Sequence, residues 1–259
     1  VPLGVFLSGG LDSSAIVSYA SDLLDVPLHT FTIDFEGKKS DDIKYSAIVS
    51  ARCKTSHIEI LMGARDAITA IDELIPMLDE PIADSGMLPA YWLSKHARNQ
   101  GIKVLLNGAG GDEIFGGYGR HWPSRFPTPG WVANNLSSML RNVISIAWSK
   151  VKPNWAVRAS DPVYEWASNV SGINFDVARQ IVNDNELYST MLKNVKSEYQ
   201  GIYATSKGPI NRYKRMKVDL HKYLPEDVLS LTDKATMAAS VEGRVPLLDH
   251  RLVEFAFSL

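Results

Sequence analysis

The sequence has little cysteine, no long apolar segment and almost no net charge. Cys53 is the only cysteine among 259 residues, so the chain cannot form an internal disulfide or a paired-cysteine metal site, and a reducing, cytoplasmic location is expected. No apolar run approaches the roughly 20 residues that span a bilayer, so no membrane partner is expected. The formal net charge is −2, which argues against a broad nucleic-acid-binding face.

Two common phosphate-binding motifs are also missing. No glycine-rich loop continues into the Gly-Lys-Ser/Thr of a Walker A motif, and no GxGxxG dinucleotide motif occurs. The six histidines show no metal-ligand spacing, and we interpret them as structural or surface residues. A nucleotide site in this chain would therefore need another kind of loop.

The first 122 residues alternate between strand-like and helix-like segments. Apolar or alternating runs predict strands at about residues 3–7, 28–35, 54–61 and 102–107. Helical spacing of apolar residues predicts helices at about 11–24, 41–52, 64–79 and 86–99. This order indicates an α/β fold, with a mainly parallel sheet of at least four strands flanked by helices.

The character of the chain changes after Trp122. A proline-rich connector leads into helical patterns with no clear strand from Trp131 onward, so we expect residues 123–259 to form a mostly helical part. Pro225, followed by acidic residues, predicts a helix start there. Residues 123–210 carry no motif that indicates a role. Because the chain begins and ends inside regular patterns, we expect it to be a fragment of a longer protein.

The stretch "FLSGGLDSS", residues 6–14, is a tight turn between a buried strand and an apolar helix pattern. Backbone N–H groups and a helix N-terminus at such a turn can hold an anion. The stretch "LNGAGGDEIFGGYGRHW", residues 106–122, is a second glycine-rich turn after another apolar strand. Both turns are expected beyond the carboxyl ends of parallel strands, where open α/β sheets bind ligands.

Each glycine-rich turn carries acidic residues: Asp12 in the first, and Asp112 with Glu113 in the second. Carboxylates beside a phosphate-binding loop suit Mg²⁺, which prefers oxygen ligands and often takes one or two carboxylates together with phosphate oxygens. The acids of the second turn could instead cap a helix N-terminus. A magnesium–nucleotide complex across both turns is the functional interpretation.

The first turn resembles the pyrophosphate loop of the N-type ATP pyrophosphatases, the PP-loop superfamily. Four further stretches add to this resemblance: "DEPIADSG", "NGAGGDEIFGGY", "YLPEDVLSLTDKATMAAS" and "VEGRVPLLDHRLVEFAF". With "VPLGVFLSGGLDSS", they resemble the synthetase domain of glutamine-hydrolysing asparagine synthetases in order and spacing. The resemblance implies an adenine nucleotide alpha hydrolase-like fold, with a nucleotide-binding α/β part at about 1–122.

The resemblance also implies roles for individual residues. The positions that match the pyrophosphate grip are Ser8, Gly9, Gly10, Ser13 and Ser14. The positions whose backbone would surround adenine and ribose are Phe6, Leu7, Ile33, Asn107 and Gly108. Asp12 and Asp112 match the Mg²⁺-binding acids. Asp84, Ser85 and Arg244 match the end of the site that receives the carboxylate substrate, and the catalytic set is Asp12, Asp112 and Arg244.

The implied activity is ATP-dependent amide formation with ATP and Mg²⁺ as cofactors. The side-chain carboxylate of aspartate would be adenylated with release of pyrophosphate, and ammonia would then displace AMP to give asparagine. The implied partners are a glutaminase domain that supplies ammonia, absent from this chain, and a second copy in a homodimer. The family's catalytic lysine would lie beyond Leu259.

One departure and three alternatives stay open. The family commonly has an acidic residue at the position of Ala109, which leaves room for a related amidotransferase or amide-bond cyclase that acts on another carboxylate. A tRNA-modifying pyrophosphatase and a non-enzymatic nucleotide-binding module are the others. Asp233 and Lys234 are interpreted as a structural ion pair or as helix-face charges.

Overall fold

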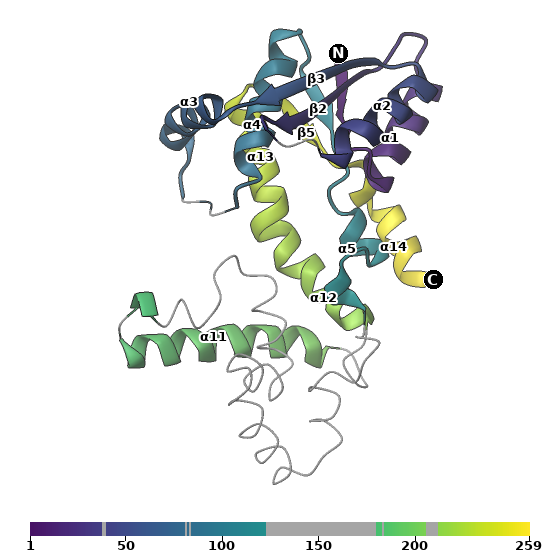
Figure 1. The fold of residues 1–259 in the computed structure, drawn as a ribbon. Coiled ribbons are helices and arrows are strands. Elements are labelled where there is room, and N and C mark those ends of the chain that lie inside the picture. The colour runs from purple at the N-terminus through teal and green to yellow at the C-terminus, as the bar shows by residue number, and fades with distance from the viewer. Residues whose placement is uncertain (38–39, 81, 83, 123–179, 183, 206–211) are drawn as a thin grey trace. The chain divides into compact units, whose positions relative to one another are not determined.

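The computed structural model describes residues 1–37, 40–80, 82, 84–122, 180–182, 184–205 and 212–259. The chain forms two compact units, residues 1–115 with 224–259, and residues 116–223 (Figure 1). No helix in the described part of the chain has the length and apolar character needed to cross a membrane. Among the helical patterns expected from Trp131 onward, the one at residues 131–148 lies wholly outside the described residues and the one at 174–185 lies mostly outside them.

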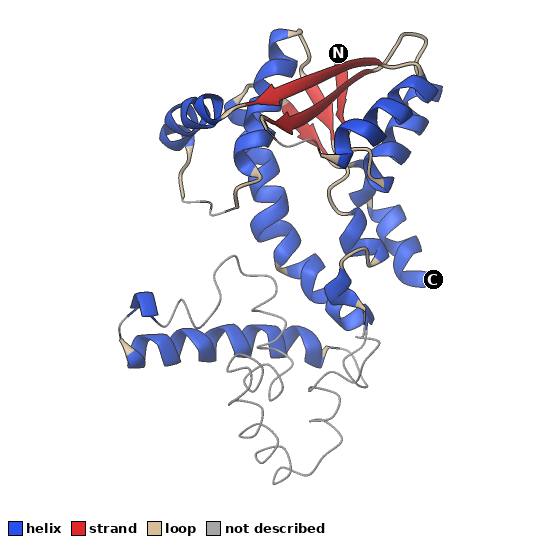
Figure 2. Ribbon diagram, in the orientation of Figure 1, coloured by secondary structure: helices blue, strands red, loops and turns tan. Residues whose placement is uncertain are grey.

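The described residues of the first unit contain one parallel sheet of five strands in the order β3-β2-β1-β4-β5. Its strands, red in Figure 2, are β1 (Leu3–Phe6), β2 (His29–Phe35), β3 (Ser56–Met62), β4 (Val104–Leu106) and β5 (Glu242–Arg244). The first four confirm the strands expected from the sequence. They form because β-branched and aromatic residues such as Val5 and Phe31 are fully buried at the centre of the sheet.

Helices cover both faces of this sheet (Figure 1). The helices of the amino-terminal half are α1 (Leu11–Asp22), α2 (Asp41–Cys53), α3 (Ala64–Leu74), the 3₁₀ turn η1 (Ile75–Met77), α4 (Met87–Asn99) and α5 (Gly111–Phe115). One core packs α1 and α2 against Val5 and Leu7 of the central strand region. The other packs α3, α4 and a later helix against Phe31 and Leu105. The α/β fold with helices flanking a parallel sheet is therefore confirmed.

The carboxyl-terminal segment returns to the first unit and completes it. It forms a π-helical turn η3 (Leu224–Leu229), α13 (Ser230–Ala238), strand β5, the 3₁₀ turn η4 (Pro246–Leu248) and α14 (His250–Ser258). Strand β5 corrects our expectation of no strand after Trp131. Its three residues have no apolar pattern, and it forms because it pairs with β4 while Gly243 packs closely on Thr236.

The second unit contains, among its described residues, the 3₁₀ turn η2 (Gly119–His121), α11 (Asn185–Ala204) and α12 (Arg212–His221). Asp219 on α12 is completely buried, and its Oδ2 atom accepts hydrogen bonds from His121 Nε2 at 2.6 Å and Arg120 Nε at 3.0 Å. The Arg120 guanidinium also lies over the rings of Tyr118 and Tyr223. This buried ion pair joins η2 to α12.

Candidate active site

The first glycine-rich turn connects β1 to the N-terminus of α1. Its hydroxyl groups bond within the turn: Ser8 N donates to Ser13 Oγ at 3.3 Å, and Ser13 Oγ donates to the Gly10 carbonyl at 3.3 Å. Gly10 is the N-cap of α1, and no side chain caps the helix there. The N-terminal amides of α1 are therefore available to an anion, as expected for a phosphate-binding turn.

The two glycines of this turn have different reasons to be glycine. Gly9 has φ +77°, and a Cβ atom there would lie 2.5 Å from Tyr45 Cβ and 2.6 Å from Ser46 N of α2. Gly9 is thus required by the backbone conformation and by its packing. Gly10 has φ −68° and ψ 165°, which any residue can adopt, and a Cβ atom there would meet only Ser8 Oγ at 3.4 Å. The fold itself gives no reason for glycine at position 10.

An unsatisfied hydroxyl supports the same interpretation of the turn. Ser14 Oγ is buried, and it has no hydrogen-bond partner among the described residues. Buried polar atoms normally have partners, so an unsatisfied one at a ligand edge suits a bound group that supplies an acceptor. Together with the open space in front of Gly10, this atom fits the phosphate groups of a nucleotide.

The second glycine-rich turn packs directly on the first. Asn107 Oδ1 accepts a hydrogen bond from Ala109 N at 2.6 Å, which shapes the turn, and Asn107 Nδ2 donates to Thr232 Oγ1 of α13 at 3.4 Å. A Cβ atom on Gly108 would lie 3.0 Å from Asp12 Cβ, and one on Gly111 would overlap the Asp12 carboxylate. Glycine at these two positions lets the turns meet.

The strand register places the nucleotide positions at one edge of the sheet. Phe6 pairs with Phe31, so Ser8 lies about level with Ile33 two residues further along each strand. Val5 pairs with Leu106, so Phe6 and Leu7 lie level with Asn107 and Gly108. Of the positions expected to surround adenine and ribose, Leu7, Asn107 and Gly108 follow the ends of β1 and β4, Phe6 is the last residue of β1, and Ile33 lies within the neighbouring strand β2.

The site brings two carboxylates together, one from each turn. Burial raises the pKa of the Asp12 carboxyl above its usual value, and the neighbouring charge of Asp112 raises that pKa further. Among the described residues no cluster of three or more possible metal ligands occurs. Two carboxylates fit Mg²⁺, because phosphate oxygens and water can complete its shell. Glu113, the other acid of the second turn, is buried.

The raised pKa of Asp12 gives a test on the metal-free protein. The charged form of Asp12 is disfavoured in the folded state, so its ionisation costs stability above the folded pKa and costs none at a pH below the unfolded value. Asp12→Asn should therefore raise the free energy of unfolding at neutral pH, and the gain should fade on acidification. Urea unfolding in EDTA at pH 7 and pH 4 measures this.

Addition of Mg²⁺–ATP should make the wild-type protein more stable than Asp12→Asn. Wild-type protein should gain stability from the bound complex, whereas Asp12→Asn should gain much less because it lacks one of the two expected metal ligands. Asp25→Asn removes a carboxylate from an exposed loop position and is the matched control, with no expected change in either condition. An Asp12→Asn variant that keeps the wild-type response to Mg²⁺–ATP would contradict the metal assignment.

The three residues expected at the carboxylate-substrate end are not joined to one another. No hydrogen bond or ion pair among the described residues links Arg244 with Asp84 or Ser85. Arg244 ends β5 beside the second turn, where its carbonyl accepts a hydrogen bond from Asn107 N at 2.9 Å, and its guanidinium is bonded to Glu242. Asp84 and Ser85 precede α4, and Asp84 Oδ1 accepts from Gly86 N at 2.6 Å.

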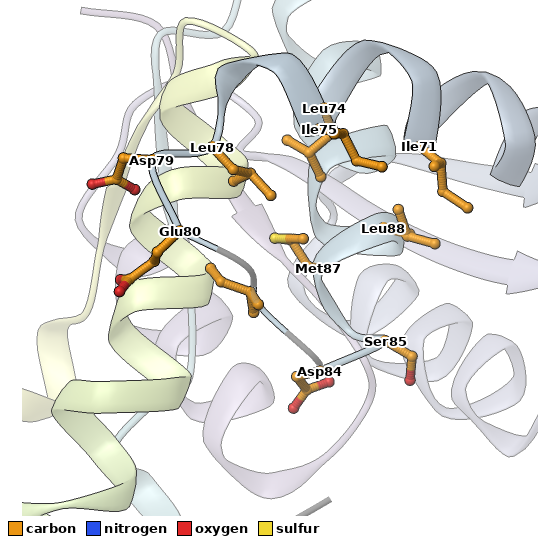
Figure 3. A pocket seen from close by; sticks show the side chains of 11 residues that line it. Ile71, Leu74, Ile75, Leu78, Asp79, Glu80, Asp84, Ser85, Met87 and Leu88 are labelled. Atoms are coloured by element: carbon orange, nitrogen blue, oxygen red, sulfur yellow. The ribbon is translucent and has the colours of Figure 1, made fainter. Parts of the chain in front are cut away.

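Sequence reasoning missed two neighbours of this region. Asp227 of η3 lies near Asp84, whose charge raises the pKa of Asp227 after the larger effect of burial. Thr232 Oγ1 of α13 accepts a hydrogen bond from the Asn107 side chain. The acidic start after Pro225 was visible in the sequence, but its partner at residue 84 was not. Lys234 forms ion pairs with Asp79 at 2.5 Å and Glu80 at 2.7 Å, whereas no ion pair between Lys234 and Asp233 is found among the described residues. Asp79 and Glu80 line a mainly apolar cavity beside α3 and α4 (Figure 3).

Comparison with known proteins gives relatives that carry the same description, asparagine synthase or asparagine synthetase. The family model for asparagine synthase matches residues 1–259. Asparagine synthetase [glutamine-hydrolyzing] 1 of Bacillus subtilis is 29% identical over 262 residues, covering 99% of this chain and 40% of that protein. A putative asparagine synthetase [glutamine-hydrolyzing] of Mycobacterium tuberculosis H37Rv is 31% identical over 268 residues, covering 100% and 39%. The chain thus spans about two fifths of the length of these relatives.

One solved structure is a weaker match. It is an NH3-dependent NAD synthetase from Campylobacter jejuni, 12% identical, with a TM-score of 0.33 over 80% of this chain and 88% of that one. A likeness this weak adds nothing to the sheet order and helix placement described above.

Proposed function

Because this chain belongs to the asparagine synthase family, we propose that it carries out ATP-dependent amide formation on the side-chain carboxylate of aspartate. A carboxylate oxygen attacks the α-phosphorus of ATP, the bond to the β-phosphate breaks, and pyrophosphate leaves. Ammonia then attacks the acyl carbon of the adenylate, AMP leaves, and asparagine forms with loss of a proton.

The observation that carries this proposal is the contact between the two glycine-rich turns. Gly108 and Gly111 leave just enough room for Asp12, and the Asp12 and Asp112 carboxylates lie close enough for one to raise the pKa of the other. Two neighbouring carboxylates would hold the magnesium ion, and the uncapped N-terminus of α1 would hold the triphosphate.

Each part of the chain has a task in this reaction. The N-terminal amides of α1, the Ser14 hydroxyl and the open side of Gly10 would hold the β- and γ-phosphates, with Ser8, Gly9 and Ser13 shaping the turn. The backbone at Phe6, Leu7, Ile33, Asn107 and Gly108 would enclose adenine and ribose. Mg²⁺ held by Asp12 and Asp112 would neutralise charge that develops on the leaving pyrophosphate.

We place Arg244 at the acceptor end of the site. The Arg244 guanidinium is 61% exposed on its side chain and lies at the end of the strand next to the second turn. In the proposed complex this guanidinium would release Glu242 and bind a substrate carboxylate, because guanidinium groups favour pairs with carboxylates. Asp84 and Ser85 would lie at the same end and bind the amino group of aspartate.

The remaining partners follow from the relatives. We propose that ammonia reaches the site from a glutaminase domain of the parent protein, that the protein acts in the cytoplasm, and that it pairs as a homodimer. Ala109 removes the acidic side chain that is common at this position, so the choice of aspartate is the part of the proposal that most needs a test.

The test is ATP–pyrophosphate exchange with a panel of carboxylates. We expect Mg²⁺-dependent exchange that requires aspartate and is lost in Asp112→Asn, and we expect asparagine when ammonium is added. Exchange that depends on another carboxylate and ignores aspartate would reject aspartate as substrate. ATP binding with no exchange for any carboxylate would reject the ligase activity.

A further inference from the structure

The backbone ladder between β1 and β2 stops one hydrogen bond before the first glycine-rich turn. Its last pair is Phe6 with Phe31, and its last backbone bond runs from Leu7 N to the Phe31 carbonyl at 2.8 Å. A parallel ladder would continue with a bond from Ile33 N to the Leu7 carbonyl. No such bond is found among the described residues. The ladder therefore leaves one donor and one acceptor for other partners.

The ladder does not stop because β2 ends. β2 stays paired with β3 as far as the pair Phe35 with Met62. The bonds from Ser56 N to the Leu28 carbonyl and from Glu36 N to the Met62 carbonyl join the even-numbered positions of this segment to β3. Alternate residues of a strand bond to opposite neighbours, so the odd-numbered positions face β1. The N–H of Ile33 thus points to the side where the chain has turned away from β1.

A threonine side chain takes the carbonyl that the ladder leaves. Thr32 is 2% exposed, and its Oγ1 atom donates a hydrogen bond to the Leu7 carbonyl. The peptide between Leu7 and Ser8 is planar and trans, so its carbonyl and its N–H point in opposite directions. The N–H of Ser8 donates to Ser13 Oγ at 3.3 Å. Two hydroxyl side chains therefore hold the first peptide of the turn, one at each polar group.

Packing alone does not require a hydroxyl at position 32. Valine has the same branched shape as threonine, and both suit strands. With valine there, the buried Leu7 carbonyl would still find a donor, because the Ile33 N–H would complete the ladder. The Thr32 hydroxyl thus selects one of two hydrogen-bonded arrangements, the one in which the ladder stays open.

We propose that Thr32 is a positioning residue for the nucleotide. Its hydroxyl holds the ladder open, so the first peptide of the turn keeps its orientation and the Ile33 N–H stays available to the base. The inference rests on the proposed function, in which the backbone at Ile33 lies against adenine, whose ring nitrogens accept hydrogen bonds. Thr32 does not touch the reacting atoms and acts through Leu7 and Ile33.

Amide hydrogen exchange, followed by NMR on the 259-residue chain without nucleotide, tests the open ladder. We expect the Ile33 amide to exchange at least about tenfold faster than the amides of Thr32 and Asp34, which lie on the β3 side. In Thr32→Val the Ile33 amide should slow about tenfold or more because the ladder closes, and Thr32→Ser should keep the wild-type rate. An Ile33 amide as slow as its neighbours in the wild-type protein would overturn the proposal.

Calorimetric titration with Mg²⁺–ATP tests the effect on binding. Thr32→Val should bind about tenfold or more weakly, because it loses a bond to the base and reorients the first peptide of the turn. Thr32→Ser keeps the hydroxyl and should bind as the wild type does. Thr30→Val is the matched control, since Thr30 is a buried threonine of the same strand whose hydroxyl bonds to Thr55 and His57. It should lose stability and keep its affinity for Mg²⁺–ATP.

The outcomes separate this inference from the proposed function. Wild-type affinity in a Thr32→Val protein that circular dichroism shows to be folded would overturn the role of Thr32. An equal loss of affinity in Thr30→Val would overturn it too, because any weakening of β2 would then suffice. Absence of Mg²⁺–ATP binding by the wild type would reject both. Mg²⁺–ATP binding without ATP–pyrophosphate exchange for any carboxylate would reject only the ligase activity and leave the role of Thr32 standing.

Discussion

Replacing Gly10 with valine should abolish nucleotide binding while the protein stays folded. The backbone at position 10 suits any residue, and a Cβ atom there meets only the Ser8 hydroxyl at an ordinary contact distance. The fold should lose only about 1 kcal/mol, the usual scale for a poorer helix N-cap. The branched side chain would fill the space in front of the α1 amides, and each hydrogen bond to a charged group is worth about 1.5–3 kcal/mol.

Loss of two such bonds weakens ATP binding by at least about a hundredfold. Calorimetric titration with Mg²⁺–ATP measures the affinity, and circular dichroism with thermal unfolding checks the fold. Gly10→Ala should show a smaller loss in the same direction. Wild-type affinity in a folded Gly10→Val protein would show that this turn does not hold the phosphates.

Gly9→Ala separates the two roles of glycine in the turn. A Cβ atom at position 9 would collide with Tyr45 and Ser46, and the backbone there has positive φ. Without nucleotide, this variant should lose clearly more stability than the roughly 1 kcal/mol expected for Gly10→Val. Comparison of the Gly9→Ala and Gly10→Val variants therefore distinguishes a glycine that the fold requires from a glycine that only a bound ligand explains.

Asp219→Ala should destabilise the second unit by about 3–5 kcal/mol, the usual result of removing one partner from a buried ion pair. Asp219 is fully buried and accepts bonds from both Arg120 and His121. Without it, the Arg120 guanidinium, whose side chain is only 15% exposed, loses its counter-charge. Hydrogen exchange of the α12 amides measures the effect locally, and urea unfolding measures it globally.

Glu198→Ala is the matched control in the same unit. Glu198 also forms an ion pair, with Lys222, but its side chain is 54% exposed. Removing an exposed pair costs less than about 1 kcal/mol. Similar losses for the two variants would show that burial does not set the strength of the Asp219 interaction. Combining Asp219→Leu with Arg120→Met should recover part of the loss, because both charged members of this ion pair are then removed together.

Helix α13 organises the acceptor side of the candidate site. Thr232 receives Asn107 of the second turn, Lys234 holds Asp79 and Glu80, and Thr236 packs against Gly243 of β5. One helix therefore sets the positions of three segments that are far apart in the sequence.

Local patterns in the sequence were enough to predict the amino-terminal half of the fold and the two glycine-rich turns. Strand and helix periodicities in residues 1–107 and glycine-rich turns after two apolar strands are local patterns, and each element formed within a few residues of its expected bounds. The predicted helix at 64–79 is shorter in the structure, where α3 ends at Leu74 and a 3₁₀ turn with Pro76 follows. The resemblance to the family was equally readable, because its motifs are contiguous.

Contacts between residues far apart in the chain could not be predicted from local patterns, because they depend on how the helices and strands pack. The Glu242–Arg244 segment has no strand pattern of its own, and it became β5 because β4 offered a free edge and Thr236 fits against Gly243. The sequence does not distinguish the roles of Gly9 and Gly10, which differ because α2 packs against Gly9. The Asp84–Asp227 pair joins positions 143 residues apart, 227 minus 84. Periodicity and turn chemistry report on near neighbours along the chain, whereas such pairs depend on how whole helices pack.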